Sequence, residues 1–282
     1  MSFAAEWHRV EQGPQPNRCR GIVVMPYDML VGELEKEASI RRIVESLYAG
    51  DLWLIKRAFP AEFMIELKAK TVEFMRSRPE SFHKMLEGSP DFHRMIDLET
   101  GKRYAFEGCK HSAYFYRWND DPLGIWPTIT ERWRVAKRIM GLRPDEYEDN
   151  TPKAGVVDRI QVVRYPPSIG YLEPHADPHL HQRCFFSGYM SKRGQDYQGG
   201  GFYVLKDGDE VREVEDMIEI GDACLGYATV YHGVAPCDRN IPPDWNDTDG
   251  RWFLSMYSNA SDEVPQRHTG RPVKLDLPGV RP

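Results

Sequence analysis

Residues 161–177 end in two side chains that can bind a metal ion. The last three residues of this stretch are His175, Ala176 and Asp177, and they directly follow a run that favours a β-strand. Side chains two positions apart on extended backbone point the same way. The imidazole of His175 and the carboxylate of Asp177 can therefore converge on one ion. This pair supplies two ligands, so a third has to come from another part of the chain.

The best candidate for the third ligand is His232, which lies in the strand-like run TVYHGV. Two histidines and one carboxylate on one face of an ion form the facial triad of non-haem Fe(II) enzymes, which leaves positions open for substrate and O₂. His179 and His181 are alternatives, because they lie near His175 in the chain. They stand in the polar run DPHLHQR, whereas the flanks of His232 alternate as in a buried strand, so we favour His232.

Arg251 opens the run RWFLSMYS and is the best candidate for binding a carboxylate. A guanidinium group can pair with a carboxylate through two parallel hydrogen bonds, as a dicarboxylate co-substrate would require. Alternation along the strand places Ser255 on the same face as Arg251, where its hydroxyl can complete the carboxylate site. Arg183, at the start of another expected strand, is the alternative position for this site.

Together these features resemble the catalytic core of the Fe(II)/2-oxoglutarate-dependent oxygenases, and most of all the prolyl-hydroxylase branch. The resemblance covers residues 161–258. A lone HxD motif occurs by chance in many proteins, but the whole series at these distances is specific. In chain order the series contains Gln161, Tyr165, Gly170, His175, Asp177, the glycines at 199–201, His232 and Arg251.

The resemblance implies which residues hold the metal and the co-substrate. For Fe(II) they are His175, Asp177 and His232. For 2-oxoglutarate they are Arg251, Tyr165, Ser255 and Gln161. The implied reaction uses O₂ to oxidise an unactivated C–H group, most often by hydroxylation, and releases succinate and CO₂. Ascorbate is a candidate stimulant. Many relatives carry Ser two residues after the Arg, where this chain has Phe253.

Residues 156–260 consist of short β segments divided by Gly, Pro and Asp, which predicts an antiparallel barrel or jelly roll. We expect an α+β fold with a double-stranded β-helix core, N-terminal helices packed on one sheet, and the metal in the mouth of the barrel. The loop at 237–250 is expected on the surface and is a candidate lid over the site. Strands are expected at 159–165, 171–174, 183–190, 201–205, 211–219, 223–231 and 251–257.

Residues 1–150 are expected to form the helical and aromatic part of the same single domain, which would span residues 1–282. Residues 80–126 carry many aromatic side chains with few periodic cues. They either wall a substrate pocket or, as the more ordinary alternative, pack in the core. Elsewhere we expect a loose arm at 1–19, strands at 20–26 and 51–59, and helices at 33–48, from Pro60 onward and at 128–140.

Composition narrows the classes of function. The net charge of −6 provides no basic surface, so nucleic acid is not an expected partner. The five cysteines stand far apart without a CxxC motif, as is typical of reduced thiols in a cytosolic protein. The N-terminal residues do not resemble a signal segment, and no apolar run approaches the roughly 20 residues of a membrane span. We therefore expect a cytoplasmic protein that does not bind membranes.

The resemblance leaves the substrate open, because one core can serve many substrates. The long aromatic first half favours a small molecule over the alternative, a residue of a protein or peptide. Two other classes of function also remain. A cupin-like metalloenzyme would not need Arg251, and a non-catalytic ligand-binding β-sandwich would need neither iron nor O₂.

Overall fold

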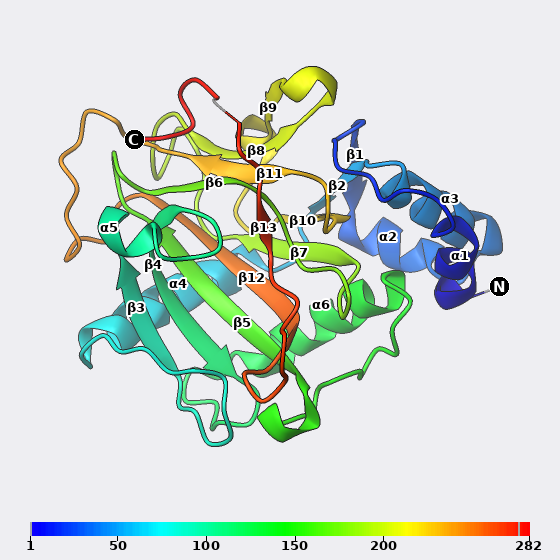
Figure 1. Ribbon diagram of the computed structural model, residues 1–282, viewed down its shortest axis with the longest axis horizontal. Helices are drawn as coiled ribbons and strands as arrows, with labels where there is room; N and C mark the ends of the chain where they lie inside the picture. Colours follow the sequence, from blue (N-terminus) through cyan, green and yellow to red (C-terminus); the bar gives the residue numbers. More distant parts are fainter. Residues whose placement is uncertain (1, 276) are drawn as a thin grey trace.

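The computed structural model describes residues 2–275 and 277–282 and combines helices with one curled sheet (Figure 1). The helices are α1 (Phe3–Val10), α2 (Tyr27–Glu33), α3 (Glu37–Tyr48), α4 (Ala61–Arg76), α5 (Leu98–Gly101) and α6 (Trp126–Ile139). Short 3₁₀ turns lie at η1 (Pro152–Ala154), η2 (Asp207–Asp209) and η3 (Glu215–Met217).

The sheet has two parts that meet at one strand. The first sheet contains β1 (Ile22–Pro26), β2 (Leu52–Lys56), β10 (Ala223–Tyr227), β7 (Cys184–Tyr189), β12 (Arg251–Ala260), β5 (Val156–Tyr165), β4 (Gly108–Tyr116) and β3 (Phe92–Ile96). The second sheet contains β6 (Tyr171–Ala176), β11 (His232–Ala235), β8 (Gly201–Leu205), β9 (Val211–Glu213) and β13 (Arg271–Pro272).

Strand β4 joins the two sheets, because it pairs with β5 over most of its length and with β6 at Gly108 and Cys109. Every pairing is antiparallel except that of β1 with β2 among the described strands. Figure 1 shows β6, β8 and β11 running at an angle to β5 and β12. A curled, mainly antiparallel sheet with added helices fits the jelly-roll-like fold predicted from the sequence.

The main hydrophobic core lies between the first sheet and helices α4 and α6. Alternation along β12 sends Leu254 and Met256 into this core, and neither side chain is exposed to solvent. Side chains from both helices, such as Leu67 and Trp133, meet them there. The opposite face of β5 and β12 is thereby left free to line a cavity between the two sheets. The expectation that helices cover one sheet is thus confirmed.

The expectation of a loose arm at 1–19 is wrong, because this segment contains α1. Ser2 caps the helix, and its hydroxyl accepts a backbone N–H bond from the first turn (3.3 Å). Phe3 and Trp7 lie one turn apart and are both buried. The indole N–H of Trp7 donates to the carbonyl of Ile139 at the end of α6 (2.6 Å). Two buried aromatics at helical spacing therefore outweigh the polar composition of the segment.

The other helices lie close to their predicted positions. Helix α4 follows Pro60, and α6 starts two residues before the predicted range of 128–140. The helix expected at 33–48 is shorter, because α3 begins at Glu37 and a bend separates it from α2. The side chain of Leu34 is buried in this bend.

Residues 80–126 hold β3 and β4, two strands that the sequence did not reveal. Their aromatics serve both of the expected purposes. Phe92 and Tyr116 are buried in a small core of their own, whereas Tyr104, Phe106 and Tyr114 line a cavity.

The predicted catalytic strands are present as β5, β6, β7, β8 and β12, but two ranges need correction. The strand expected at 211–219 ends at Glu213, because Glu215 turns inward and forms a buried ion pair with Arg251. The strand expected at 223–231 ends at Tyr227. A turn at 228–231 then carries the chain from the first sheet to β11 in the second.

All five cysteines are free and buried, in agreement with the expected reduced thiols. Among the described residues, no helix combines the length and the apolar character that crossing a bilayer would require.

A buried ion pair joins α6 to the first sheet. Lys137 on α6 contacts the carboxylate of Asp158 on β5, and the side chains of both residues are 1% exposed. Ser258 on β12 donates its hydroxyl hydrogen to the same carboxylate (2.8 Å). Burial raises the pKa of Asp158 and lowers that of Lys137, so each charge depends on the other for stabilisation.

We predict that Lys137→Met lowers the free energy of unfolding by about 3–5 kcal/mol, because it leaves Asp158 charged and buried without its partner. Urea denaturation followed by circular dichroism would measure the loss. The double variant Lys137→Met/Asp158→Asn should recover part of it, and Lys102→Met, which removes an exposed pair with Glu99, should change little. A urea midpoint of Lys137→Met equal to that of wild type would contradict the prediction.

Candidate active site

His175, Asp177 and His232 come together between the two sheets. The Nε2 atom of His175 lies 3.6 Å from Oδ1 of Asp177, and the Nε2 atom of His232 lies 3.6 Å from Oδ2. These separations are too long for hydrogen bonds. They suit atoms that share one metal ion, since first-row ions bind N and O ligands at about 2.0–2.2 Å. Ligand atoms of all three residues lie within 4.8 Å of one another, and all three residues are buried.

The hydrogen bonds of the two imidazoles point their free nitrogens at this position. Nδ1 of His175 lies 2.9 Å from the carbonyl oxygen of Glu173, and Nδ1 of His232 lies 2.9 Å from that of Val230. A carbonyl can only accept, so Nδ1 carries the hydrogen in each ring. Nε2 therefore keeps its lone pair, as a metal ligand requires. The Oδ2 atom of Asp177 is buried and accepts no hydrogen bond from the described residues.

Strand register places the two histidines opposite each other. His232 on β11 pairs with His175 on β6, and Val234 pairs with Leu172. Two steps on β11 thus correspond to three on β6, so β6 has a bulge next to Pro174, which has no N–H to donate. Asp177 is held just beyond the strand, because its N–H donates to the carbonyl of Ala228 in the turn before β11 (2.9 Å).

The electrostatics of the triad favour the protonation states that bind a cation. Burial lowers the pKa of His175, and the neighbouring His232 lowers it further, so the imidazole stays neutral. Burial alone would raise the pKa of Asp177, but the two imidazoles outweigh it and hold this pKa well below its usual range. A neutral imidazole and an ionised carboxylate are the forms that ligate metals.

An inner cavity beside the triad is lined by Arg251, Tyr165, Tyr189 and Phe253, together with the three candidate ligands. Arg251 pairs with Tyr165 across β12 and β5, and its side chain is 2% exposed. The rings of Tyr165, Tyr189 and Phe253 lie 5.3–5.8 Å from its guanidinium carbon. They fix the direction of this side chain.

Glu215 holds Arg251 from behind, through a buried ion pair between its carboxylate and Nε of the guanidinium. The same carboxylate accepts hydrogen bonds from the N–H of Phe202 (2.6 Å) and the hydroxyl of Tyr197 (2.8 Å). Burial lowers the pKa of Arg251, but Glu215 and the neighbouring tyrosines together outweigh it and raise this pKa above its ordinary value. Arg251 is therefore permanently charged and rigidly positioned.

Two buried donors face this region without acceptors among the described residues, the Nη1 atom of Arg251 and the hydroxyl of Tyr165. Burial raises the pKa of Tyr165, so its hydroxyl keeps its proton. Buried donors are normally satisfied, so the pair indicates an acceptor that belongs between them. A carboxylate fits both. Ser255 lies further along β12, opposite Gln161, and lines neither this cavity nor the next.

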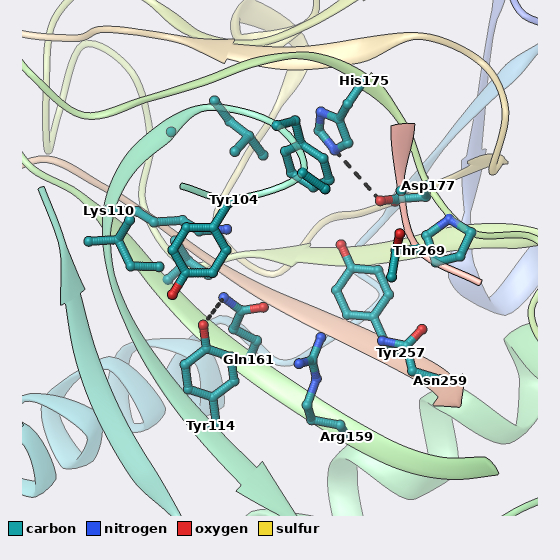
Figure 2. Close-up of a pocket in the computed structure, with 18 of the residues that line it drawn as sticks. Tyr104, Lys110, Tyr114, Arg159, Gln161, His175, Asp177, Tyr257, Asn259 and Thr269 are labelled. Atoms are coloured by element: carbon teal, nitrogen blue, oxygen red, sulfur yellow. Dashed lines mark hydrogen bonds and ion pairs between the residues drawn. The ribbon is translucent and has the colours of Figure 1, made fainter. Parts of the chain in front are cut away.

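A larger outer cavity lies on the other side of His175 and Asp177 (Figure 2). Gln161 lines this outer cavity and is not among the residues that line the inner one. Its amide donates to the hydroxyls of Ser112 (2.9 Å) and Tyr114 (3.3 Å). Phe106 stacks on the ring of His175, with ring centroids 4.2 Å apart. The outer cavity therefore has direct access to the candidate metal position.

The alternatives that the sequence left open lie elsewhere. His179 stacks edge-on against His268 (5.0 Å), and neither His179 nor His181 joins the described ligand group. Arg183 forms an ion pair with Glu11 (2.9 Å) on the far side of β7. Residues 237–250 line neither cavity, and part of this loop is held by Arg164, which donates to the carbonyl of Asp249 (2.8 Å).

Neither protein-family models nor curated protein sequences match this chain. Solved structures do. A prolyl-4-hydroxylase of Pseudomonas putida matches with a TM-score of 0.51 and 12% identity, over 78% of this chain and 98% of that one. The thymine-7-hydroxylase of Neurospora crassa, in its complex with alpha-ketoglutarate and thymine, matches with a TM-score of 0.51 and 12% identity, over 86% of each chain.

The fold is that of the Fe(II)/2-oxoglutarate oxygenases. The resemblance indicated by the sequence motifs is thereby confirmed at the level of architecture. At 12% identity, this similarity establishes the oxygenase fold alone.

Sequence reasoning missed three charged residues, namely Glu215 behind Arg251 and Lys110 and Arg159 in the lining of the outer cavity. Glu215 was hidden, because its ion pair with Arg251 is a contact between distant segments. Lys110 lies in the region that showed no periodic pattern. Arg159 could have been found, since alternation along β5 puts it on the same face as Gln161 and Tyr165.

We predict that His175→Ala, Asp177→Ala and His232→Ala each weaken Fe(II) binding by more than about 100-fold, because each removes one of the three converging ligand atoms. Anaerobic equilibrium titration would measure the affinity, and circular dichroism would show that the chain still folds. His179→Ala and His181→Ala serve as matched controls. Normal Fe(II) affinity in His232→Ala, with a loss in either control, would refute this ligand set.

Proposed function

We propose that this chain is an Fe(II)- and 2-oxoglutarate-dependent dioxygenase with a double-stranded β-helix core, forming one catalytic domain. It oxidises an unactivated C–H group of a small molecule by hydroxylation and releases succinate and CO₂. The observation that carries the proposal is the adjacency of two features. The three converging ligands and the positioned guanidinium of Arg251 share one buried inner cavity.

Each residue has a task that follows from its surroundings. His175, Asp177 and His232 would hold Fe(II) on one face, and the bound iron and co-substrate supply the oxidising chemistry. Arg251 would donate a hydrogen bond from Nη1 to the distal carboxylate of 2-oxoglutarate, and Tyr165 would donate its hydroxyl hydrogen to the same group. Phe106 and the other aromatic side chains keep the neighbourhood of His175 apolar, which limits the access of water.

The cupin-like alternative is not supported by the inner cavity, because such an enzyme has no need of a buried arginine with a free donor beside its metal. A small-molecule substrate is supported by the outer cavity, whose lining includes the side chains of Tyr104, Phe106 and Tyr257.

The proposal predicts that Fe(II) added anaerobically, followed by 2-oxoglutarate, produces a weak visible charge-transfer band. The band requires both components at one site, so neither alone should produce it. Absorption spectroscopy in an anaerobic cell would detect it, and Asp177→Ala should abolish it. A protein that binds Fe(II) but shows no band with 2-oxoglutarate would favour the cupin-like class.

We further predict that Arg251→Ala raises the KM for 2-oxoglutarate by about 100-fold or more, because a buried charged donor is lost. Arg251→Lys should recover part of the affinity, since it restores the charge but not the planar guanidinium that directs the donor. The lysine variant also keeps a cation beside Glu215, which separates co-substrate binding from effects on folding. Arg183→Ala is the matched control, and a loss of affinity in that variant instead would move the carboxylate site.

A further inference from the structure

The outer cavity contains two cations that have no anionic partner among the described residues, Lys110 and Arg159. Neither side chain forms a hydrogen bond or an ion pair in the described part of the chain, although both line this cavity. Asp177 is the one carboxylate among the residues that line it, and Asp177 faces the two imidazoles. The cavity therefore has an excess of positive charge.

Arg159 is held in place by its neighbours. It pairs with Tyr257 across β5 and β12, and its guanidinium carbon lies 5.6 Å from the Tyr257 ring centroid and 5.4 Å from that of Tyr114. Its Nε atom is buried and has no acceptor among the described residues. A solvated surface arginine would place its donors in water, whereas this one presents an unsatisfied donor in a fixed direction.

Lys110 enters the same cavity from a neighbouring strand. Figure 2 shows Lys110 on β4 and Arg159 on β5 pointing into the space below His175 and Asp177. Burial and the charge of Arg159 lower the pKa of Lys110, Asp177 raises it in part, and the net result is a pKa of about 8. The two cations thus repel each other across the cavity. An anion between them would remove this repulsion and satisfy the buried donor of Arg159.

The remaining polar groups of the cavity suit the neutral part of a ligand. Gln161, Asn259 and Thr269 offer hydrogen bonds without charge, and the rings of Tyr104 and Phe106 supply apolar walls. Arg267 already pairs with Asp262, so its charge is compensated. The uncompensated charge is therefore confined to Lys110 and Arg159.

We propose that the outer cavity binds the substrate through an acidic group, a carboxylate or a phosphate or sulfate ester, held between Arg159 and Lys110. The assignment of this ligand as the substrate rests on the proposed function, since the rest of the molecule then faces His175 and Asp177. The anion site itself depends only on the two unpaired cations.

Sulfate is the first probe, and thermal unfolding is the measurement. Samples contain Mn(II) and 2-oxoglutarate to fill the inner cavity without turnover, and sodium chloride at equal ionic strength is the reference. Wild type should show a saturable rise in Tm of about 3 °C at ten times the dissociation constant. Sulfate also stabilises proteins non-specifically, so the difference between wild type and variants is the signal.

Arg159→Gln and Lys110→Gln should each lose the saturable rise. Arg159→Lys keeps the charge and should retain part of it, which covers the case in which Arg159→Gln folds poorly. Arg103→Gln is the matched control, because Arg103 is exposed near the rim and does not line the cavity. It should behave as wild type.

Parallel titrations with acetate and methyl phosphate identify the acid, since the better-fitting group saturates at lower concentration. No saturable rise with any of the three anions, or an equal rise in Arg159→Gln and Lys110→Gln, would overturn the anion site. The shift caused by 2-oxoglutarate itself is recorded first in Arg159→Gln, in which the anion site is lost, and tests the proposed function separately. Its absence beside an intact, Arg159-dependent sulfate response would refute the dioxygenase and leave the anion site standing.

Discussion

The pairing of His232 with His175 between β11 and β6 is the contact on which the rest of the site depends. An ion needs ligand atoms within a few ångströms of one another, and two imidazoles from distant segments meet this condition only in one register. The bulge beside Pro174 sets that register. The hydrogen bond from Asp177 to the carbonyl of Ala228 then ties the carboxylate to the turn that leads into β11. One small group of backbone contacts thus positions all three side chains.

Charge balance explains why Glu215 lies next to Arg251. Arg251 is buried, which would be costly for an unpaired cation, and Glu215 compensates it while leaving Nη1 free. The glycine run that leads into β8 and includes its first residue, Gly201, makes this possible. A Cβ on Gly201 would lie 2.2 Å from Cγ of Glu215, and its φ of +103° favours glycine as well. Gly201 therefore makes room for a buried ion pair.

Different parts of the fold line the two cavities. The inner cavity is lined by side chains from strands β5, β6, β7, β8, β11 and β12, which belong to the two facing sheets of the fold. The outer cavity is walled by Tyr104, Phe106 and residues 267–270, which lie between or beyond these strands. Segments of this kind vary most freely between proteins of one fold, so under the proposed function they would select the substrate.

The sequence by itself determined which residue types could form the centre, because ligand types and strand alternation are local properties. HxD on extended backbone, a strand histidine and an arginine with its alternation partners are all visible without coordinates. The tertiary structure alone decided which residues complete the site. Glu215 reaches Arg251 across 36 positions, and Lys110 meets Arg159 from another strand. It also assigned Gln161 to the lining of the outer cavity and turned residues 1–19 into a docked helix. Each of these contacts joins segments that are far apart in the chain. A local sequence pattern does not specify which distant segments lie side by side.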